Sequence, residues 1–112
     1  MALTEKREDK TAILSVDGRL MGGEETKEIV VRIRALVEDG VQNVVLDLSG
    51  VPWMNSTGLG ALMESRKVLA DKSGALKLVA MNEKIKSLLV MTQTLSHYEN
   101  FASVEEAVQS CA

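Results

Sequence analysis

Residues 44–63 read VVLDLSGVPWMNSTGLGALM, and the rest of the chain is arranged around this stretch. It begins with an apolar, β-branched run of strand length, which Ser49-Gly50 and then Pro52 interrupt. The apolar residues that follow, beginning with Leu59 and Leu62, recur at helical spacing. The stretch therefore predicts a strand, a short loop and a helix.

Three short polar residues, Asn55, Ser56 and Thr57, stand where the loop meets this helix. Each has a side-chain oxygen that can cap the first helical turn, and the pattern does not choose among them. The neighbours of the capping residue lie beside free backbone N–H groups and the positive end of the helix dipole. An anion is stabilised at such a position, including a phosphate made on a hydroxyl.

Strands and helices are expected to alternate along the rest of the chain. In chain order we expect strands at 2–8 and 11–16, a helix at 24–38 stopped by Gly40, a strand at 41–48, a helix at 56–71, a strand at 76–80, a short helix capped by Asn82, a strand at 98–101 and a last helix capped by Ser103. This order predicts one α/β domain over residues 1–112, with a mixed, mostly parallel sheet of about four to five strands, about four flanking helices and an N-terminal antiparallel hairpin.

Loops that follow parallel strands emerge at the carboxyl edge of the sheet, where open α/β sheets usually place their binding surface. Three such loops are predicted here: residues 18–23, the turn at 55–57, and the turn Met81-Asn82. We expect these three loops to converge into one site.

Composition and charge exclude several classes of function. The 112 residues are 46% hydrophobic and 26% charged, which is typical of a globular domain. The net charge is −3 and the basic residues are scattered among acids, so direct nucleic-acid binding is not expected. No run has the length of a membrane span and no N-terminal apolar block resembles a signal sequence, which predicts a cytoplasmic protein without membrane insertion.

The residue types needed for catalysis or metal binding are scarce. Cys111 and His97 are the only cysteine and histidine, which excludes a disulfide and a Cys/His metal shell, and Cys111 is expected to be an inert thiol on a frayed end. Gly58 and Gly60 lack the lysine and the spacing of a phosphate-binding loop, and no Gly-x-Ser-x-Gly elbow occurs. A Ser-His-Asp triad would require His97 to fold back onto the serine loop. We therefore expect neither an enzyme nor a cofactor.

Large apolar residues near the site allow two interpretations. Trp53 is either a binding anchor or, as is more common for an aromatic after a strand, packed beneath the following helix. Most of the methionines are expected to fill gaps in the core, including Met54, Met63 and Met91. Only Met21 and Met81 lie in the converging loops and are expected to contribute to a contact patch.

The chain resembles STAS domains, in particular the bacterial anti-sigma factor antagonists. The resemblance rests on Val-Leu-Asp-Leu-Ser-Gly-Val at 45–51, on Trp53-Met54, and on Asn-Ser-Thr-Gly-Leu-Gly at 55–60. It also covers Gly-Arg-Leu at 18–20, Lys-Ser-Gly-Ala at 72–75 and Ser-Val-Glu-Glu-Ala at 103–107, and so extends over nearly the whole chain. The first serine of that family's Asp-Ser-Ser/Thr-Gly-Leu-Gly signature is phosphorylated by a partner that is both anti-sigma factor and kinase. The matching residue here is Ser56, with Thr57 as second choice.

The resemblance implies a protein-binding switch. The unmodified protein would bind an anti-sigma factor and serine kinase of ATPase fold, freeing a sigma factor, and a serine phosphatase would be a further partner. The residues that would contact the partner are Gly18, Arg19, Leu20, Met21, Gly22, Asn55, Ser56, Thr57, Gly58, Met81 and Asn82.

This chain departs from the family pattern at three places. Asn55 replaces the usual Asp, Met21 replaces the acidic residue common after the loop leucine, and Thr92-Gln93-Thr94 replaces Thr-Gly-Leu. Asparagine keeps the hydrogen-bonding shape of aspartate but not its charge, so capping survives while any electrostatic role of the acid is lost.

Three other functions compete with the switch. A structural, unphosphorylated STAS subunit, of a lipid-transporting ABC complex or a stress-signalling scaffold, would use the same surface to brace a partner. A small-molecule or nucleotide sensor rests only on the polar loop cluster, and an enzyme lacks an assignable acid and base.

Overall fold

The elements follow one another in the order expected from the sequence. The computed structural model describes residues 2–111. Its elements are β1 (Ala2–Glu8), β2 (Thr11–Asp17), α1 (Glu24–Glu38), β3 (Asn43–Gly50), α2 (Ser56–Ala70), β4 (Ala75–Val79), α3 (Glu83–Met91), the 3-10 helix η1 (Leu95–His97), β5 (Glu99–Phe101) and α4 (Val104–Ser110). The expected mixed α/β fold is confirmed, and η1 is an element that the sequence analysis did not indicate.

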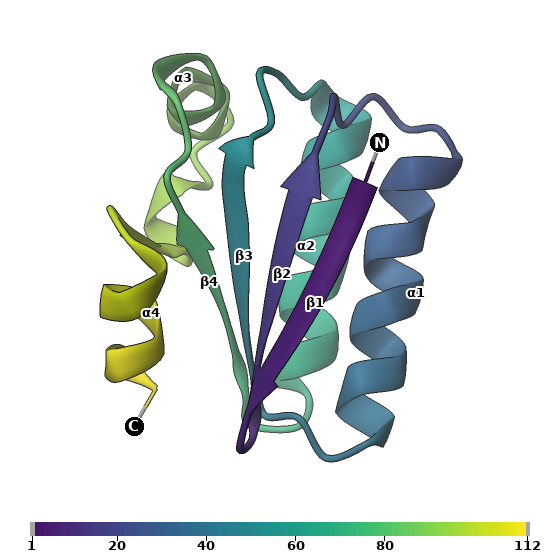
Figure 1. The fold of residues 1–112 in the computed structure, drawn as a ribbon. Coiled ribbons are helices and arrows are strands. Elements are labelled where there is room, and N and C mark those ends of the chain that lie inside the picture. The colour runs from purple at the N-terminus through teal and green to yellow at the C-terminus, as the bar shows by residue number, and fades with distance from the viewer. Residues whose placement is uncertain (1, 112) are drawn as a thin grey trace.

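The sheet is ordered β1-β2-β3-β4-β5, the same as the order along the chain. β1 pairs with β2 in an antiparallel hairpin, and the pairs from β2 to β5 are all parallel. Helices α1 and α2 cover one face of the sheet and α4 lies on the other (Figure 1). Because β2, β3 and β4 are parallel, the loops that follow them all leave the sheet at the same edge.

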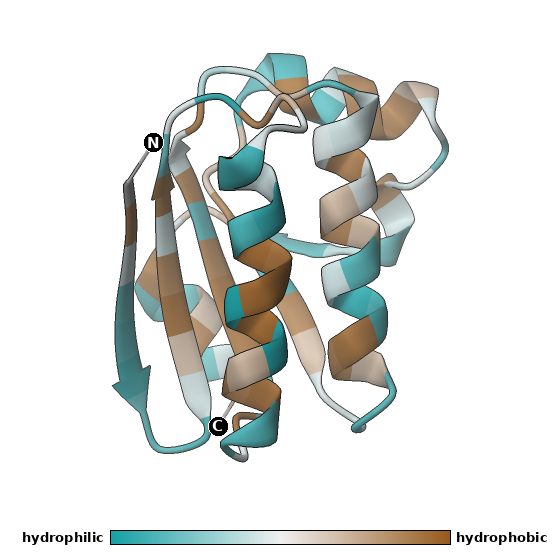
Figure 2. Cartoon of the chain, turned by 90° about the vertical axis from the view of Figure 1, so that its right-hand side faces the viewer, coloured by the Kyte–Doolittle hydropathy of each residue, from teal (hydrophilic) through white to brown (hydrophobic). Residues whose placement is uncertain are grey.

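Alternating side chains of the central strands divide the interior into two clusters. Leu14, Leu46 and Leu78 occupy neighbouring strands, are fully buried, and belong to the large cluster with α1 and α2. Val45 and Val79 point to the other face and pack with Ala107 of α4. Figure 2 shows a separate contrast between two strands: β2 is largely hydrophobic, whereas the edge strand β1 becomes hydrophilic toward its C-terminal end. An edge strand carrying charge resists pairing with another chain.

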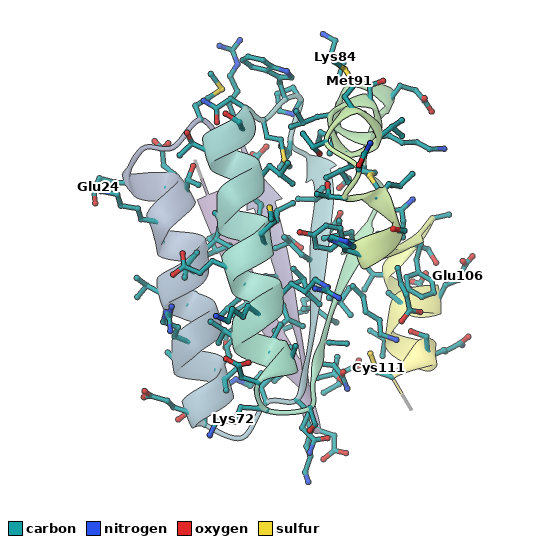
Figure 3. All side chains as sticks on the ribbon, turned by 180° about the vertical axis from the view of Figure 1, so that it is seen from behind. Glu24, Lys72, Lys84, Met91, Glu106 and Cys111 are labelled. Atoms are coloured by element: carbon teal, nitrogen blue, oxygen red, sulfur yellow. The ribbon has the colours of Figure 1, made fainter. Side chains whose placement is uncertain are left out.

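Helix α2 buries one row of side chains that includes Leu59, Leu62 and Leu69. Met63 does not share this row and is 46% exposed, and Met91 is 82% exposed on the outer side of α3 (Figure 3). The expectation that most methionines fill the core is therefore wrong, and among those considered only Met54 is fully buried. Within residues 2–111, no helix is both long and apolar enough to cross a membrane.

Helix α4 is fastened to the sheet by a buried lysine. The Lys77 ammonium donates to the Ser110 hydroxyl at 2.8 Å and pairs with the Glu99 carboxylate at 3.5 Å, and it lies 5.7 Å from the centre of the Phe101 ring. Cys111 is half-buried and packs against the cluster of Val45, Val79 and Ala107. Its thiol donates to the carbonyl of Ala107. The frayed end expected for Cys111 is thus wrong, because α4 is packed through its last turn.

Strand β1 is joined to α1 by a chain of ion pairs. The Arg7 guanidinium lies 3.1 Å from the Glu5 carboxylate and 3.2 Å from that of Asp39, and Arg32 lies 3.1 Å from Glu5. The hydrogen bond from Arg7 lowers the pKa of Glu5 below its ordinary value of 4.5, and Arg32 lowers it further, which together outweigh the opposing effect of desolvation. The network holds the edge strand against the helix layer.

Replacing Glu5 by glutamine is expected to lower the melting temperature at neutral pH but not in acid. A carboxyl whose pKa is lower in the folded state contributes stability that is present above the unfolded pKa and is lost as the pH falls through the folded pKa. The contribution is under about 1 kcal/mol because the pair is partly solvated. Thermal unfolding of both proteins between pH 7 and pH 3 tests this, with Glu8→Gln on the same strand as control. Parallel curves for wild type and Glu5→Gln at every pH would contradict it.

Candidate functional site

Asn55 is the residue that caps helix α2. Its backbone is extended, and its side-chain oxygen accepts a hydrogen bond from the Gly58 N–H at 2.9 Å. Ser56 and Thr57 are consequently the first two helical residues, and both are exposed. The Ser56 hydroxyl therefore stands at the positive end of a 15-residue helix, where negative charge is stabilised.

A short parallel bridge joins the loop after β2 to the segment after β3. Leu20 pairs with Met54, the Leu20 N–H donates to the Trp53 carbonyl at 3.1 Å, and the Asn55 N–H donates to the Leu20 carbonyl at 3.1 Å. The Leu20 and Met54 side chains are both buried, at 0% and 1% exposure. Because side chains alternate along extended backbone, the residues on either side of each point outward.

The third loop joins the same segment from the other side. Asn82 caps α3 by accepting from the Ile85 N–H at 2.9 Å, and its amide nitrogen donates to the Pro52 carbonyl at 2.9 Å. The neighbouring Met81 is half-buried and packs against the core. All three predicted loops thus meet along residues 51–55, as the sequence analysis expected.

We call the exposed side chains at this end of the molecule the loop surface. Its members are Arg19, Met21, Trp53, Ser56, Thr57 and Asn82. Met21 is 41% and Trp53 44% exposed, so the surface combines two large apolar groups with an arginine and hydroxyls. Trp, Arg and Met are enriched in protein interfaces, which makes this composition suited to binding another protein.

Two of the residues expected to contact a partner lie beneath this surface instead. Leu20 is fully buried, and Gly58 is buried against it, since a β-carbon added to Gly58 would lie 2.3 Å from the Leu20 carbonyl oxygen. Gly18 and Gly22 are half-buried, and Gly22 lies against the Thr57 side chain with a positive φ of 94°. Leu20 and Gly58 therefore shape the loops from beneath, and the partner contacts expected of Gly18 and Gly22 stay a prediction.

Trp53 is exposed at the surface, whereas the sequence analysis favoured a position packed beneath the following helix. The bridge explains the difference, because Met54 takes the buried position next to Leu20 and forces the adjacent Trp53 outward. The signal in the sequence was the Trp53-Met54 pair itself. Two adjacent residues of an extended segment cannot both face the core, and the smaller, more flexible one occupies it here.

A hydrophobic groove of about 560 Å³ continues from the site between α1 and α2. Gly22 and Thr57 line its near end, Val30 and Val31 line its side, and the groove extends to Arg34 and Glu64, whose side chains are 2.9 Å apart. The groove adds an apolar area next to Thr57, one residue after Ser56.

The groups needed for metal or triad chemistry are not assembled at this site. Within residues 2–111, no three His, Cys, Asp or Glu side chains are grouped so that they could hold a metal ion. The carbonyl of His97 accepts from the Arg66 side chain at 2.9 Å, and Arg66 lies ten residues beyond Ser56 on α2, or roughly 15 Å along the helix. His97 is thus held beside a later part of α2, far from its first turn.

Comparison with known proteins identifies the class. The model of the STAS domain family matches residues 2–107, and the chain belongs to this family. Over 80 residues it is 32% identical to the probable sulfate transporter 3.5 of Arabidopsis thaliana, a match that covers 65% of this chain but only 12% of the transporter. This chain therefore corresponds to a small part of that relative.

Solved structures with the same fold include two anti-sigma factor antagonists or their relatives. A putative anti-sigma factor antagonist from Thermotoga maritima has a TM-score of 0.87 at 23% identity, covering 96% of this chain and 92% of the other. The Bacillus cell fate determinant SpoIIAA in its phosphorylated form has a TM-score of 0.79 at 16% identity, covering 99% and 100%. At these identities the likeness establishes the fold alone.

Proposed function

We propose that this chain is an anti-sigma factor antagonist, a binding protein rather than an enzyme, whose docking is controlled by phosphorylation of Ser56. The observation that carries the proposal is the position of Ser56, exposed at the N-terminus of α2 on the loop surface that also exposes Met21 and Trp53. Membership of the STAS family and the fold shared with SpoIIAA, a protein known in a phosphorylated form, support it.

The proposed partner is an anti-sigma factor that is also a serine kinase of ATPase fold, and a serine phosphatase would reverse the modification. The unmodified loop surface binds this partner and thereby frees a sigma factor in the cytoplasm. Neither nucleic acid nor a membrane takes part directly.

The physical effect of the switch is local. A phosphate on Ser56 adds about −1.5 to −2 charges at neutral pH. The N-terminus of α2 stabilises this charge, so the domain stays folded. An apolar interface closed over Trp53 and Met21 would have to desolvate the phosphate, which disfavours the complex. Modification therefore changes binding without a change of fold.

Ser56→Ala is expected to abolish phosphate incorporation by the cognate kinase with Mg-ATP while preserving binding. Ser56→Asp is expected to keep the fold but to weaken the complex about tenfold, because one buried, partly compensated charge costs about 1–2 kcal/mol. Ser96→Asp adds the same charge at an exposed position of η1 and serves as control. Mass spectrometry and calorimetric titration measure the two effects.

Two results together would contradict the proposed switch. If protein isolated from its native cell in growth and in stress carries no phosphate on Ser56 or Thr57, and Ser56→Asp binds the partner as wild type does, the switch is wrong.

A second candidate is a STAS unit that braces a transport or scaffold assembly without phosphorylation. The similarity to a plant sulfate transporter favours this alternative, because it places a related segment within a much longer membrane-transport protein. The phosphate measurement above separates the two candidates, since only the switch requires modification.

A further inference from the structure

The side-chain amide of Asn55 makes two hydrogen bonds in different directions. Its oxygen accepts from the Gly58 N–H at 2.9 Å, which caps α2, and its nitrogen donates to the Met21 carbonyl at 3.0 Å. The second bond spans 34 residues of sequence and reaches the loop after β2. The cap of one helix is thus also a tie to a separate loop.

Asn82 repeats this arrangement one strand further along the sheet. Its oxygen accepts from the Ile85 N–H at 2.9 Å and caps α3, while its nitrogen donates to the Pro52 carbonyl at 2.9 Å. The second bond again reaches back, here over 30 residues, to the segment that precedes α2. The two asparagines therefore connect α3 to residues 52–55, and residues 52–55 to the loop that carries Met21.

The chemistry of these contacts requires a carboxamide. An amide presents one acceptor and one donor group on the same planar unit, which matches an N–H on one side and a carbonyl on the other. An ionised carboxylate accepts only, so it would place a negative oxygen against the carbonyl of Met21 or Pro52. A serine caps equally well, but its single oxygen cannot reach both partners.

We propose that Asn55 and Asn82 are positioning residues that hold the three loops together as one rigid loop surface, with Met21 and Trp53 fixed relative to Ser56. Each does so through its amide nitrogen, independently of its capping oxygen. What this surface binds rests on the function proposed above, but the two ties are properties of the isolated domain.

The test compares Asn, Asp and Ser at each position, because all three are nearly equal as helix caps. If Asn55 and Asn82 only cap, Asn→Asp and Asn→Ser leave stability unchanged, and Asp even gains from the helix dipole. If they tie the loops, both substitutions at each position lower the melting temperature by about 3 °C. They also reduce the hydrogen-exchange protection of the Leu20 amide, which bonds to Trp53, by about fivefold.

Ser103 provides the matched control. Its hydroxyl caps α4 by accepting from the Glu106 N–H at 3.2 Å, and within residues 2–111 it makes no other hydrogen bond through its side chain. Ser103→Asn and Ser103→Asp are expected to leave both measurements unchanged. Equal behaviour of the Asn55, Asn82 and Ser103 series would overturn the proposal.

The melting temperature and the hydrogen exchange are both measured without a partner, so their outcome does not depend on the proposed function. Loosening of the loops in the Asn55 and Asn82 variants supports the ties even if Ser56 is never phosphorylated. Conversely, phosphorylation of Ser56 with unchanged loops in the same variants would support the switch and refute the ties.

Discussion

Replacing Gly58 by alanine is expected to lower the free energy of unfolding by about 2–3 kcal/mol, the range of severe overpacking in a close-packed region. A β-carbon at this position would lie 2.3 Å from the Leu20 carbonyl oxygen and 3.1 Å from its carbonyl carbon. These are backbone atoms, fixed by the bridge between Leu20 and Met54, so they cannot rotate away as a flexible side chain would. Relief requires α2 to separate from the loop after β2, and urea unfolding measures the cost.

Gly60 offers a control two residues along the same helix. It is exposed, and a β-carbon there meets no atom within 4 Å. Gly60→Ala is therefore expected to raise the free energy of unfolding by about 0.5–1 kcal/mol, the gain in helix propensity. If both alanine variants shift the free energy of unfolding in the same direction, the close contact between Gly58 and Leu20 does not explain the need for glycine at position 58.

Replacing Trp53 by alanine is expected to weaken partner binding about 30-fold, or about 2 kcal/mol, which is typical of an aromatic interface hot spot. The side chain is 44% exposed in the isolated domain, so much of its apolar area remains to be buried in a complex. The melting temperature is expected to change little. Calorimetric titration against the anti-sigma factor proposed as partner, together with thermal unfolding, separates the two effects.

Met91→Ala is the control for this substitution. Met91 is the most exposed of the large apolar side chains within residues 2–111, at 82%, and it ends α3, whereas Asn82 at the start of that helix belongs to the loop surface. Its truncation is expected to leave affinity unchanged. Equal losses for Trp53→Ala and Met91→Ala, or a loss of affinity that merely follows unfolding, would show that Trp53 is no anchor.

Local signals in the sequence were sufficient for most of the architecture. Asn82 and Ser103 were recognised as helix caps, and Gly40 as a stop, because each acts on residues within one helical turn. The strands from β2 to β4 were recognised from apolar runs, with boundaries within about two residues. Convergence of three loops followed from parallel topology alone.

The details of the site depend on contacts between segments distant in sequence. The sequence analysis described Asn55 as an aspartate without its charge. In the structure, the side-chain N–H of Asn55 donates to the Met21 carbonyl, 34 residues away, and no local pattern reveals this partner. The outward position of Trp53 depends in the same way on the Leu20–Met54 bridge. On α2, Ser65 rather than Met63 lies in the buried row, because the direction of burial is set by the position of the helix on the sheet.

The strand order β1-β2-β3-β4-β5 has a consequence for how the chain folds as it is synthesised. Each strand pairs with the one made just before it, so no strand must insert between two that are already paired. Pairing between strands that follow one another in the chain limits the length of the loop that each pairing closes. Ser56 emerges before Asn82, and the tie from Asn82 to Pro52 forms only after β4 is complete. The nascent chain therefore carries Ser56 before it carries Asn82, the last residue of the loop surface to be synthesised.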